Sequence, residues 1–184
     1  MYGLVNLAIE ELVIKVAGPD VWEAVKADVG FSDGRFILME SYPDELTYKL
    51  VASVSERLEM TPHDVLKAFG KHWIKFTAAE GYGDLIQTSA DNLVDCLDGL
   101  DRMHAQFEAT VEGLNLPSFD LEPQDESGIY LLRYYSDREG LAPMVLGLID
   151  GLAEMFNESC TIEHLSEESS TVDHEIFRLQ LSAA

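Results

Sequence analysis

The chain has 184 residues, a length that suits one domain, and its 34 acidic and 12 basic residues give a formal net charge of −22. A charge of this sign repels nucleic acid and anionic lipid surfaces, so neither is expected as a partner. No apolar run approaches the roughly 20 residues of a membrane span, and the N-terminus has no secretory-signal pattern, so a cytoplasmic globular protein is expected.

Four helices are predicted in the first 80 residues. Apolar side chains recur at helical spacing over 4–16, 20–30, 43–58 and 61–73. The stretches between them carry residues that begin or end helices: Gly18-Pro19, Asp20 with Glu23 as a capping-box pair, Gly30, Pro43-Asp44 and Thr61-Pro62.

Two helices and four strands are predicted in the rest of the chain. Ser89 is the expected N-cap of a long helix with an apolar stripe of Leu93, Leu97, Leu100, His104, Phe107 and Val111. Extended segments at 116–121 and 129–135 flank a turn-rich stretch and predict a hairpin. A helix over 143–156 follows, and then two strands near 161–165 and 176–181, joined by an acidic turn at 166–173.

This order of elements predicts an α+β fold. An N-terminal helical lobe is expected over 1–62 and a second lobe over 63–184. In the second lobe a four-stranded antiparallel sheet packs one face on the His104 helix and on the 143–156 helix. The two lobes are expected to form a single compact unit.

A Tyr-x-Ser-x-Arg spacing begins in the second strand of the predicted hairpin. Tyr134, Ser136 and Arg138 would place two hydroxyls and a guanidinium along one edge of an extended segment. Arginine can meet a carboxylate with two parallel hydrogen bonds, and the hydroxyls can add two more. The pattern therefore indicates a clamp for carboxylates. The alternative is an exposed strand face with a surface ion pair.

His104 lies on the apolar stripe of the long helix, so its side chain is expected to point inward. A lone histidine in such a place is more often a core residue than a metal ligand. Together with the Tyr134, Ser136 and Arg138 pattern, however, it makes the chain resemble the H-NOX family of haem-based gas sensors. Further resemblance is seen in Met1-Tyr2-Gly3-Leu4-Val5, in Ala68-Phe69-Gly70 and in Leu146-Gly147-Leu148-Ile149-Asp150-Gly151, and it runs nearly end to end.

The resemblance implies haem b, iron protoporphyrin IX, buried between the two lobes. His104 would be the axial ligand of the iron, and Tyr134, Ser136 and Arg138 would hold the two propionates. Asp44 or Glu45 could brace Arg138. Pro117 matches a proline that presses the porphyrin out of plane in the family; its alternative is the start of an edge strand.

The distal residues bear on which gas is sensed. Oxygen-binding relatives carry a tyrosine three residues before the glycine of Leu-Gly-Leu, where this chain has Met144. Trp73 falls where relatives have a polar or bulky distal residue, although core packing is its alternative role. Val5, Ile9 and Leu148 complete the expected apolar wall. Nitric oxide and carbon monoxide are the expected ligands, and oxygen is not.

Other candidate sites find less support. His72 is the alternative axial ligand. His164 and His174 lie where some relatives bind zinc, but no cysteine is near, so zinc is not expected. Cys96 and Cys160 are isolated and fit a reducing compartment. Asp98 and Asp101 are expected to face solvent.

The resemblance implies a stand-alone sensor that is not an enzyme. In the family, gas binding weakens the bond between iron and histidine and the lobes rotate. A separate histidine kinase or cyclic-di-nucleotide enzyme would receive the signal. The alternatives are a haem-free small-molecule-binding module of related fold and a haem enzyme, which would need a distal acid-base residue.

Overall fold

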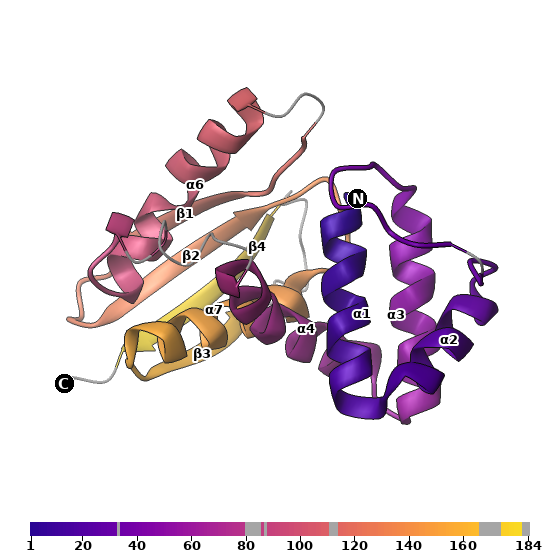
Figure 1. The fold of residues 1–184 in the computed structure, drawn as a ribbon. Helices are drawn as coiled ribbons and strands as arrows, with labels where there is room; N and C mark the ends of the chain where they lie inside the picture. The colour runs from indigo at the N-terminus through magenta and orange to yellow at the C-terminus, as the bar shows by residue number, and fades with distance from the viewer. Residues whose placement is uncertain (33, 80–85, 87, 111–113, 166–173, 182–184) are drawn as a thin grey trace.

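The computed structural model describes residues 1–32, 34–79, 86, 88–110, 114–165 and 174–181 (Figure 1). The predicted α+β class is confirmed, with helices in the first half of the chain and an antiparallel sheet in the second. The helices are α1 (Gly3–Ala17), α2 (Pro19–Asp28), α3 (Asp44–Leu58), α4 (Pro62–Thr77), α6 (Leu93–Thr110) and α7 (Ala142–Phe156). The strands are β1 (Ser118–Pro123), β2 (Ile129–Tyr135), β3 (Cys160–Leu165) and β4 (His174–Leu181).

Helices α1 to α4 form the N-terminal part of the molecule. Proline occupies the first turn of α2 and of α4, where its missing N–H costs nothing, and two acidic residues begin α3 at the positive end of its dipole. The Thr61 hydroxyl accepts a hydrogen bond from the Asp64 amide at 3.1 Å and so caps α4. The apolar faces of these helices meet in one core around the fully buried Val13, Trp22, Val25 and Leu50.

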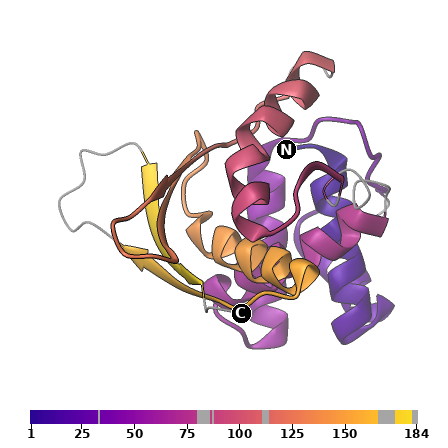
Figure 2. The same ribbon diagram turned by 90° about the vertical axis from the view of Figure 1, so that its left-hand side faces the viewer.

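The sheet has the strand order β1-β2-β4-β3, and every neighbouring pair is antiparallel. Figure 2 shows α6 and α7 on the same side of this sheet. The second core lies between the sheet and these two helices. Its members include Phe119, Leu132, Tyr134, Phe177 and Leu179 of the sheet, Leu93 and Leu97 of α6, and Val145, Ile149 and Leu152 of α7. The predicted packing of one sheet face on these two helices is confirmed.

Helices α4 and α7 approach each other so closely that their backbones touch. A Cβ on Gly70 would overlap the Met144 carbonyl oxygen, and a Cβ on Gly147 would overlap the Lys67 carbonyl oxygen. Glycine is therefore needed on both helices. An ion pair of 3.1 Å between Lys67 and Asp150 borders the contact. Because α4 supplies side chains to both cores, this helix pair joins the two halves of the molecule.

Two helices and one strand begin at other residues than the sequence predicted. Helix α6 begins at Leu93, because Asn92 accepts the Asp95 amide at 2.9 Å, whereas the Ser89 hydroxyl donates to the Ile86 carbonyl. Helix α2 begins at Pro19, and no side chain caps it, so the predicted Asp20 and Glu23 capping box does not form. Strand β1 starts at Ser118 instead of residue 116. Val111 and the turn at 166–173 lie outside the described residues.

The structure also bears on membrane insertion. Within the described ranges, no helix combines the length and the apolar character that crossing a membrane requires.

Candidate functional site

The ring of His104 is held by the segment that leads into β1. Its Nδ1 lies 2.8 Å from the Pro117 carbonyl oxygen. A carbonyl oxygen only accepts hydrogen bonds, so Nδ1 must carry the proton. In the neutral ring, Nε2 then carries the lone pair, and no residue of the described chain bonds it. This arrangement is typical of metal-ligating histidines, which donate the other ring N–H to a carbonyl or carboxylate.

Asp101 fixes the same segment from one helical turn earlier. Its carboxylate accepts the Phe119 amide at 2.7 Å and the Ser118 hydroxyl at 3.0 Å. Asp101 is exposed, as expected, but its carboxylate also makes these two contacts, which were not predicted. Residues three apart share a helix face, so the spacing of Asp101 and His104 was the signal that could have identified it. Together the two side chains tie α6 to three consecutive residues of the chain, 117–119.

The part of α6 that carries His104 has an incompletely buried apolar face. Leu93, Cys96 and Leu97 are the buried residues of this helix. Farther along, Leu100, Met103, His104 and Phe107 are only half-buried. This face can therefore receive an apolar group beside the free Nε2. Figure 2 shows that the end of α6 extends beyond the sheet and beyond α7.

Of the three clamp residues, only Tyr134 is on a strand. Strand β2 ends at Tyr135, so Ser136 and Arg138 lie in the turn that follows, and the predicted single strand edge is wrong for these two. Ser136 contacts Arg138 directly: its hydroxyl oxygen accepts the Arg138 amide at 3.1 Å. Burial raises the pKa of Tyr134, so its hydroxyl stays protonated near neutral pH.

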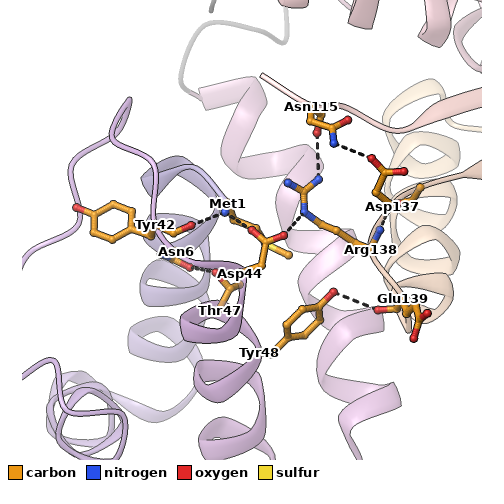
Figure 3. A network of polar contacts seen from close by, with 11 residues as sticks. Met1, Asn6, Tyr42, Asp44, Thr47, Tyr48, Asn115, Asp137, Arg138 and Glu139 are labelled. Carbon is orange, nitrogen blue, oxygen red and sulfur yellow. Dashed lines mark hydrogen bonds and ion pairs between the residues drawn. The ribbon is translucent and has the colours of Figure 1, made fainter. Parts of the chain in front are cut away.

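The Arg138 guanidinium bridges two distant parts of the chain (Figure 3). Its Nε donates to Asp44 of α3 at 2.8 Å, and its Nη1 donates to the Asn115 carbonyl at 3.0 Å. Asp44 is therefore the brace, and no described bond links Glu45 to Arg138. Nη2 has no partner in the described part of the chain, so the fixed guanidinium can still donate to a carboxylate ligand.

Asp44 is itself held by two cations. Besides Arg138, it contacts the Met1 ammonium, which also donates to the Tyr42 carbonyl at 2.6 Å. Partial burial would raise the pKa of Asp44, but the hydrogen bonds from Met1 and Arg138 outweigh it and lower that pKa. Asp44 is therefore a carboxylate at neutral pH, as the brace of a guanidinium must be.

A small apolar cavity of about 20 Å³ lies between α1, α3, α4 and the start of α7. Such a volume holds roughly one water-sized molecule. Thr47 and Tyr48 also line it, but their hydroxyls bond elsewhere: Thr47 donates to Asn6 at 2.8 Å and Tyr48 donates to the Glu139 carbonyl at 3.2 Å. The other lining residues are Met1, Val5, Ile9, Val51, Leu66, Phe69, Leu141 and Met144.

Trp73 and Leu148 do not line this cavity. The Trp73 ring packs 6.0 Å from that of Phe69 and 6.3 Å from that of Phe76, and Leu148 packs on the second core. The structure thus brings Val5, Ile9 and Met144 together at one cavity. Trp73 and Leu148 belong to the packed side chains outside the cavity.

The remaining histidines have other surroundings. His72 Nε2 lies 3.3 Å from a Glu11 carboxylate oxygen on α1, and burial lowers the pKa of this ring. His164 Nε2 lies 2.7 Å from Glu175 on the neighbouring strand. Across the described ranges, no group of three or more His, Cys, Asp and Glu side chains is arranged to hold a metal ion.

Comparisons with known sequences agree on one family. A family model described as Haem-NO-binding matches residues 2–164. The chain is 31% identical over 193 residues to soluble guanylate cyclase gcy-34 of Caenorhabditis elegans, and 34% identical over 157 residues to gcy-32 of the same organism. The matches cover 98% and 84% of this chain, but only 28% and 23% of those proteins.

Solved structures share the fold along the whole chain. An H-NOX protein from S. oneidensis in the Fe(II)NO state has a TM-score of 0.89 at 24% identity, and the match covers 100% of both chains. An oxygen-binding H-NOX domain related to soluble guanylate cyclases, in its oxygen complex, has a TM-score of 0.82 at 21% identity and covers 100% of this chain and 96% of that one. Because these neighbours carry different gases, the shared fold does not decide which gas is bound.

The donor groups described above fit a haem. A histidine with a free Nε2 lies on a half-buried apolar face, and a braced guanidinium with a free Nη2 suits an acidic side chain of the macrocycle. The predicted resemblance is confirmed. The chain belongs to the Haem-NO-binding, or H-NOX, family, a haem-based gas-sensor domain as in soluble guanylate cyclases, which is a sensor module and not itself catalytic.

Proposed function

We propose that this domain binds haem b and that His104 Nε2 is the axial ligand of its iron. The contact between Nδ1 and the Pro117 carbonyl carries the proposal, because it orients the ring and leaves Nε2 as the nitrogen that can bind iron. When bound, the haem supplies a ferrous iron that takes up diatomic gases. Pro117, which holds the ring, is also the residue proposed to press on the porphyrin.

Tyr134, Ser136 and Arg138 are proposed to hold the haem propionates. Arg138 Nη2 is available to a carboxylate, and the contacts with Asp44 and Asn115 keep the guanidinium plane fixed while it donates. The hydroxyl of Ser136, which accepts the Arg138 amide, is proposed to donate its own hydrogen to the same carboxylate. Loss of the guanidinium would leave the propionates to weaker neutral donors.

Nitric oxide is the proposed physiological ligand, with carbon monoxide as a second ligand. A bound oxygen molecule gains stability from a hydrogen-bond donor, whereas nitric oxide binds tightly without one. The cavity wall of Val5, Ile9 and Met144 is apolar, and the hydroxyls of Thr47 and Tyr48 donate elsewhere. Trp73 and Leu148 are proposed to support this wall from behind.

The signal is proposed to pass by relative movement of the two lobes, 1–62 and 63–184, to a separate histidine kinase or cyclic-di-nucleotide enzyme. The apolar cavity is lined by Val5 and Ile9 of the first lobe and by Phe69 and Met144 of the second, so a change in its content would act on both lobes. The gas can shift the lobes only by the difference in binding free energy between the two arrangements. The free thiols Cys96 and Cys160 support a cytoplasmic location.

The absorption spectrum of the purified chain, supplied with haem and then desalted, tests the cofactor. We expect a Soret band that His104→Gly abolishes or shifts. His63→Gly, a change at an exposed residue in the first turn of α4, should leave the band in place. A colourless wild-type chain would contradict the proposal and favour a haem-free binding module. An unchanged spectrum in His104→Gly would assign the ligand role to another residue.

The gas preference is tested with ferrous protein in air. We expect no stable oxygen complex, and a spectral change on adding nitric oxide. A lasting oxygen complex would show that the wall contains a hydrogen-bond donor. The effector is tested by measuring autophosphorylation of candidate histidine kinases with and without nitric oxide, in the presence of the loaded sensor.

A further inference from the structure

Three polar side chains on the first two turns of α3 reach different parts of the molecule (Figure 3). Asp44 bonds Arg138, Thr47 bonds Asn6 of α1, and Tyr48 bonds the Glu139 carbonyl. Residues at spacings of three and four share one helix face, so α3 presents all three together. Two of these bonds reach the turn between β2 and α7, at the neighbouring residues 138 and 139.

Of the three residues, Tyr48 alone both lines the apolar cavity and bonds the turn that follows β2. Its ring lines the apolar cavity beside Leu141 and Met144. Its hydroxyl lies outside the cavity and donates to the Glu139 carbonyl at 3.2 Å. Burial and the nearby Asp44 charge raise the pKa of Tyr48, so the hydroxyl remains a donor at neutral pH. A shift of the ring must therefore move or break the bond at residue 139.

The turn held by Tyr48 carries Arg138 and leads directly into α7. The Arg138 amide bonds Ser136, Gly140 has a positive φ of 74°, and the Leu141 carbonyl accepts the amides of Met144 and Val145 as α7 begins. Residue 139 thus lies between Arg138 of the clamp and Leu141 of the cavity wall. Displacing its carbonyl would move both of these residues.

We propose that Tyr48 is a positioning residue that couples the content of the apolar cavity to the geometry of the Arg138 clamp, through its bond to the Glu139 carbonyl. The proposal rests on the proposed function in one respect, that the clamp holds the acidic side chains of the haem. Tyr48 needs no contact with the haem for this role. Asp44 fixes the guanidinium itself, and Tyr48 fixes the backbone that carries it.

Tyr48→Phe tests the coupling, because it keeps the ring in the cavity wall and removes only the hydroxyl. Haem loss is followed by transfer to excess apomyoglobin. Losing one neutral hydrogen bond that orients the clamp should speed haem loss roughly threefold to tenfold. The matched control is Tyr42→Phe, which also loses one bond to the backbone, the 3.0 Å bond that its hydroxyl accepts from the Ile37 amide; that hydroxyl points away from Arg138, and the Tyr42 carbonyl that holds Met1 is unchanged. It should lose haem at the wild-type rate.

A double-mutant cycle separates coupling from general loss of stability. Met144→Ala enlarges the cavity next to Tyr48, and its effect on haem loss should be at least twofold smaller when Tyr48→Phe is also present. Residues that act through one shared contact are not additive. Additive effects of the two substitutions would overturn the coupling.

Hydrogen exchange on the haem-free chain supplies a readout that does not depend on the cofactor. Peptides covering 138–142 should exchange faster in Tyr48→Phe than in the wild type or in Tyr42→Phe. Equal exchange in all three would overturn the role of Tyr48, whether or not haem binds. If the wild type bound no haem, the proposed function would fail, and the exchange result would still decide whether Tyr48 holds this turn.

Discussion

At the scale of single residues, the site depends on side chains that hold other side chains. His104 is oriented by Pro117, the segment after Pro117 is held by Asp101, and Arg138 is oriented by Asp44. The contacts of Pro117 and Asp44 each leave one functional nitrogen free, Nε2 of His104 and Nη2 of Arg138. Preorganisation of this kind limits the entropy that a bound group would otherwise have to overcome.

Asp101→Ala should destabilise the start of β1. The substitution leaves the Phe119 amide and the Ser118 hydroxyl without their acceptor, and we expect the free energy of unfolding in urea to fall by about 1–3 kcal/mol. Asp98→Ala, one turn earlier on the same exposed side of the helix, is the control and should change it by less than about 0.5 kcal/mol. Equal losses in the two variants would contradict the role assigned to Asp101.

His72 should make stability depend on pH. Burial lowers its pKa below the ordinary histidine value of 6.5, the Glu11 carboxylate acts in the opposite direction, and the charges of Lys15 and Lys75 reinforce the lowering. Because the unfolded chain then binds a proton more readily than the folded one, stability should fall as pH drops through 6.5 and below.

Urea unfolding of the haem-free chain between pH 5 and 8 measures this dependence. His72→Gln should flatten the slope near pH 6, whereas His63→Gln, at an exposed ring, should keep it. A wild-type slope in the His72 variant would show that another group is responsible.

At the scale of elements, the contact between α4 and α7 sets how the two cores meet. It depends on Gly70 and Gly147, where a side chain would collide with the facing backbone. Backbone atoms cannot rotate away as a flexible side chain can, so the helices themselves would have to separate. Ion pairs from Lys71 and Lys75 to Glu154 continue the same interface.

Gly147→Ala should therefore destabilise the protein strongly. Forcing the helices apart is expected to cost about 1–3 kcal/mol or more in thermal or urea unfolding. Gly99→Ala on α6 is the matched control, because a Cβ there has no atom within 4 Å. The higher helix propensity of alanine should make that variant more stable, by about 0.5–1 kcal/mol. Tolerance of alanine at both sites would contradict the close packing of α4 on α7.

At the scale of the whole molecule, the excess of acidic groups is the dominant electrostatic feature. The 34 acidic residues outnumber the 12 lysines and arginines by 22, so most carboxylates have no basic side chain to pair with. Charges that repel across the whole surface favour expansion of the chain. Surface ion pairs act in the opposite direction, but each contributes little.

Added salt should therefore stabilise this protein. Raising sodium chloride from 0.01 to 0.1 M shortens the screening length from about 30 to about 10 Å, which weakens repulsion between distant acids more than attraction within ion pairs. We expect the melting temperature to rise across this range, and potassium chloride to act equally. A fall would show that the ion pairs outweigh the repulsion.

Much of the fold followed from local sequence patterns. The apolar period of α1, α3 and α4 identified these helices, and the turn-rich stretch before β2 identified the hairpin. Helix starts were less secure: several polar residues near α6 can cap a helix, and the choice of Asn92 over Ser89 depends on contacts such as the one from the Leu93 amide to Glu158.

The candidate site was also predicted only in part. The types and spacings of Tyr134, Ser136, Arg138 and His104 were readable in the sequence, and their roles toward haem stay predictions. The contacts of Asp101 were not predicted, because its spacing from His104 gives the helix face but does not specify which later segment that face meets. The turn that carries Ser136 and Arg138 also differed from the extended segment predicted, because the pairing of β2 with β4 ends at Tyr135.

The sequence by itself determined the family, through the motifs in which it resembles H-NOX proteins. It also determined the α+β class and the residue types available to the site, since these depend on short periodic patterns and on composition. Only the tertiary structure decided that Asp44 braces Arg138 across 94 residues, that Tyr48 reaches Glu139 across 91, and that α4 and α7 touch through glycine. Such contacts depend on how whole helices pack against one another, and no local pattern specifies which distant groups that packing brings together.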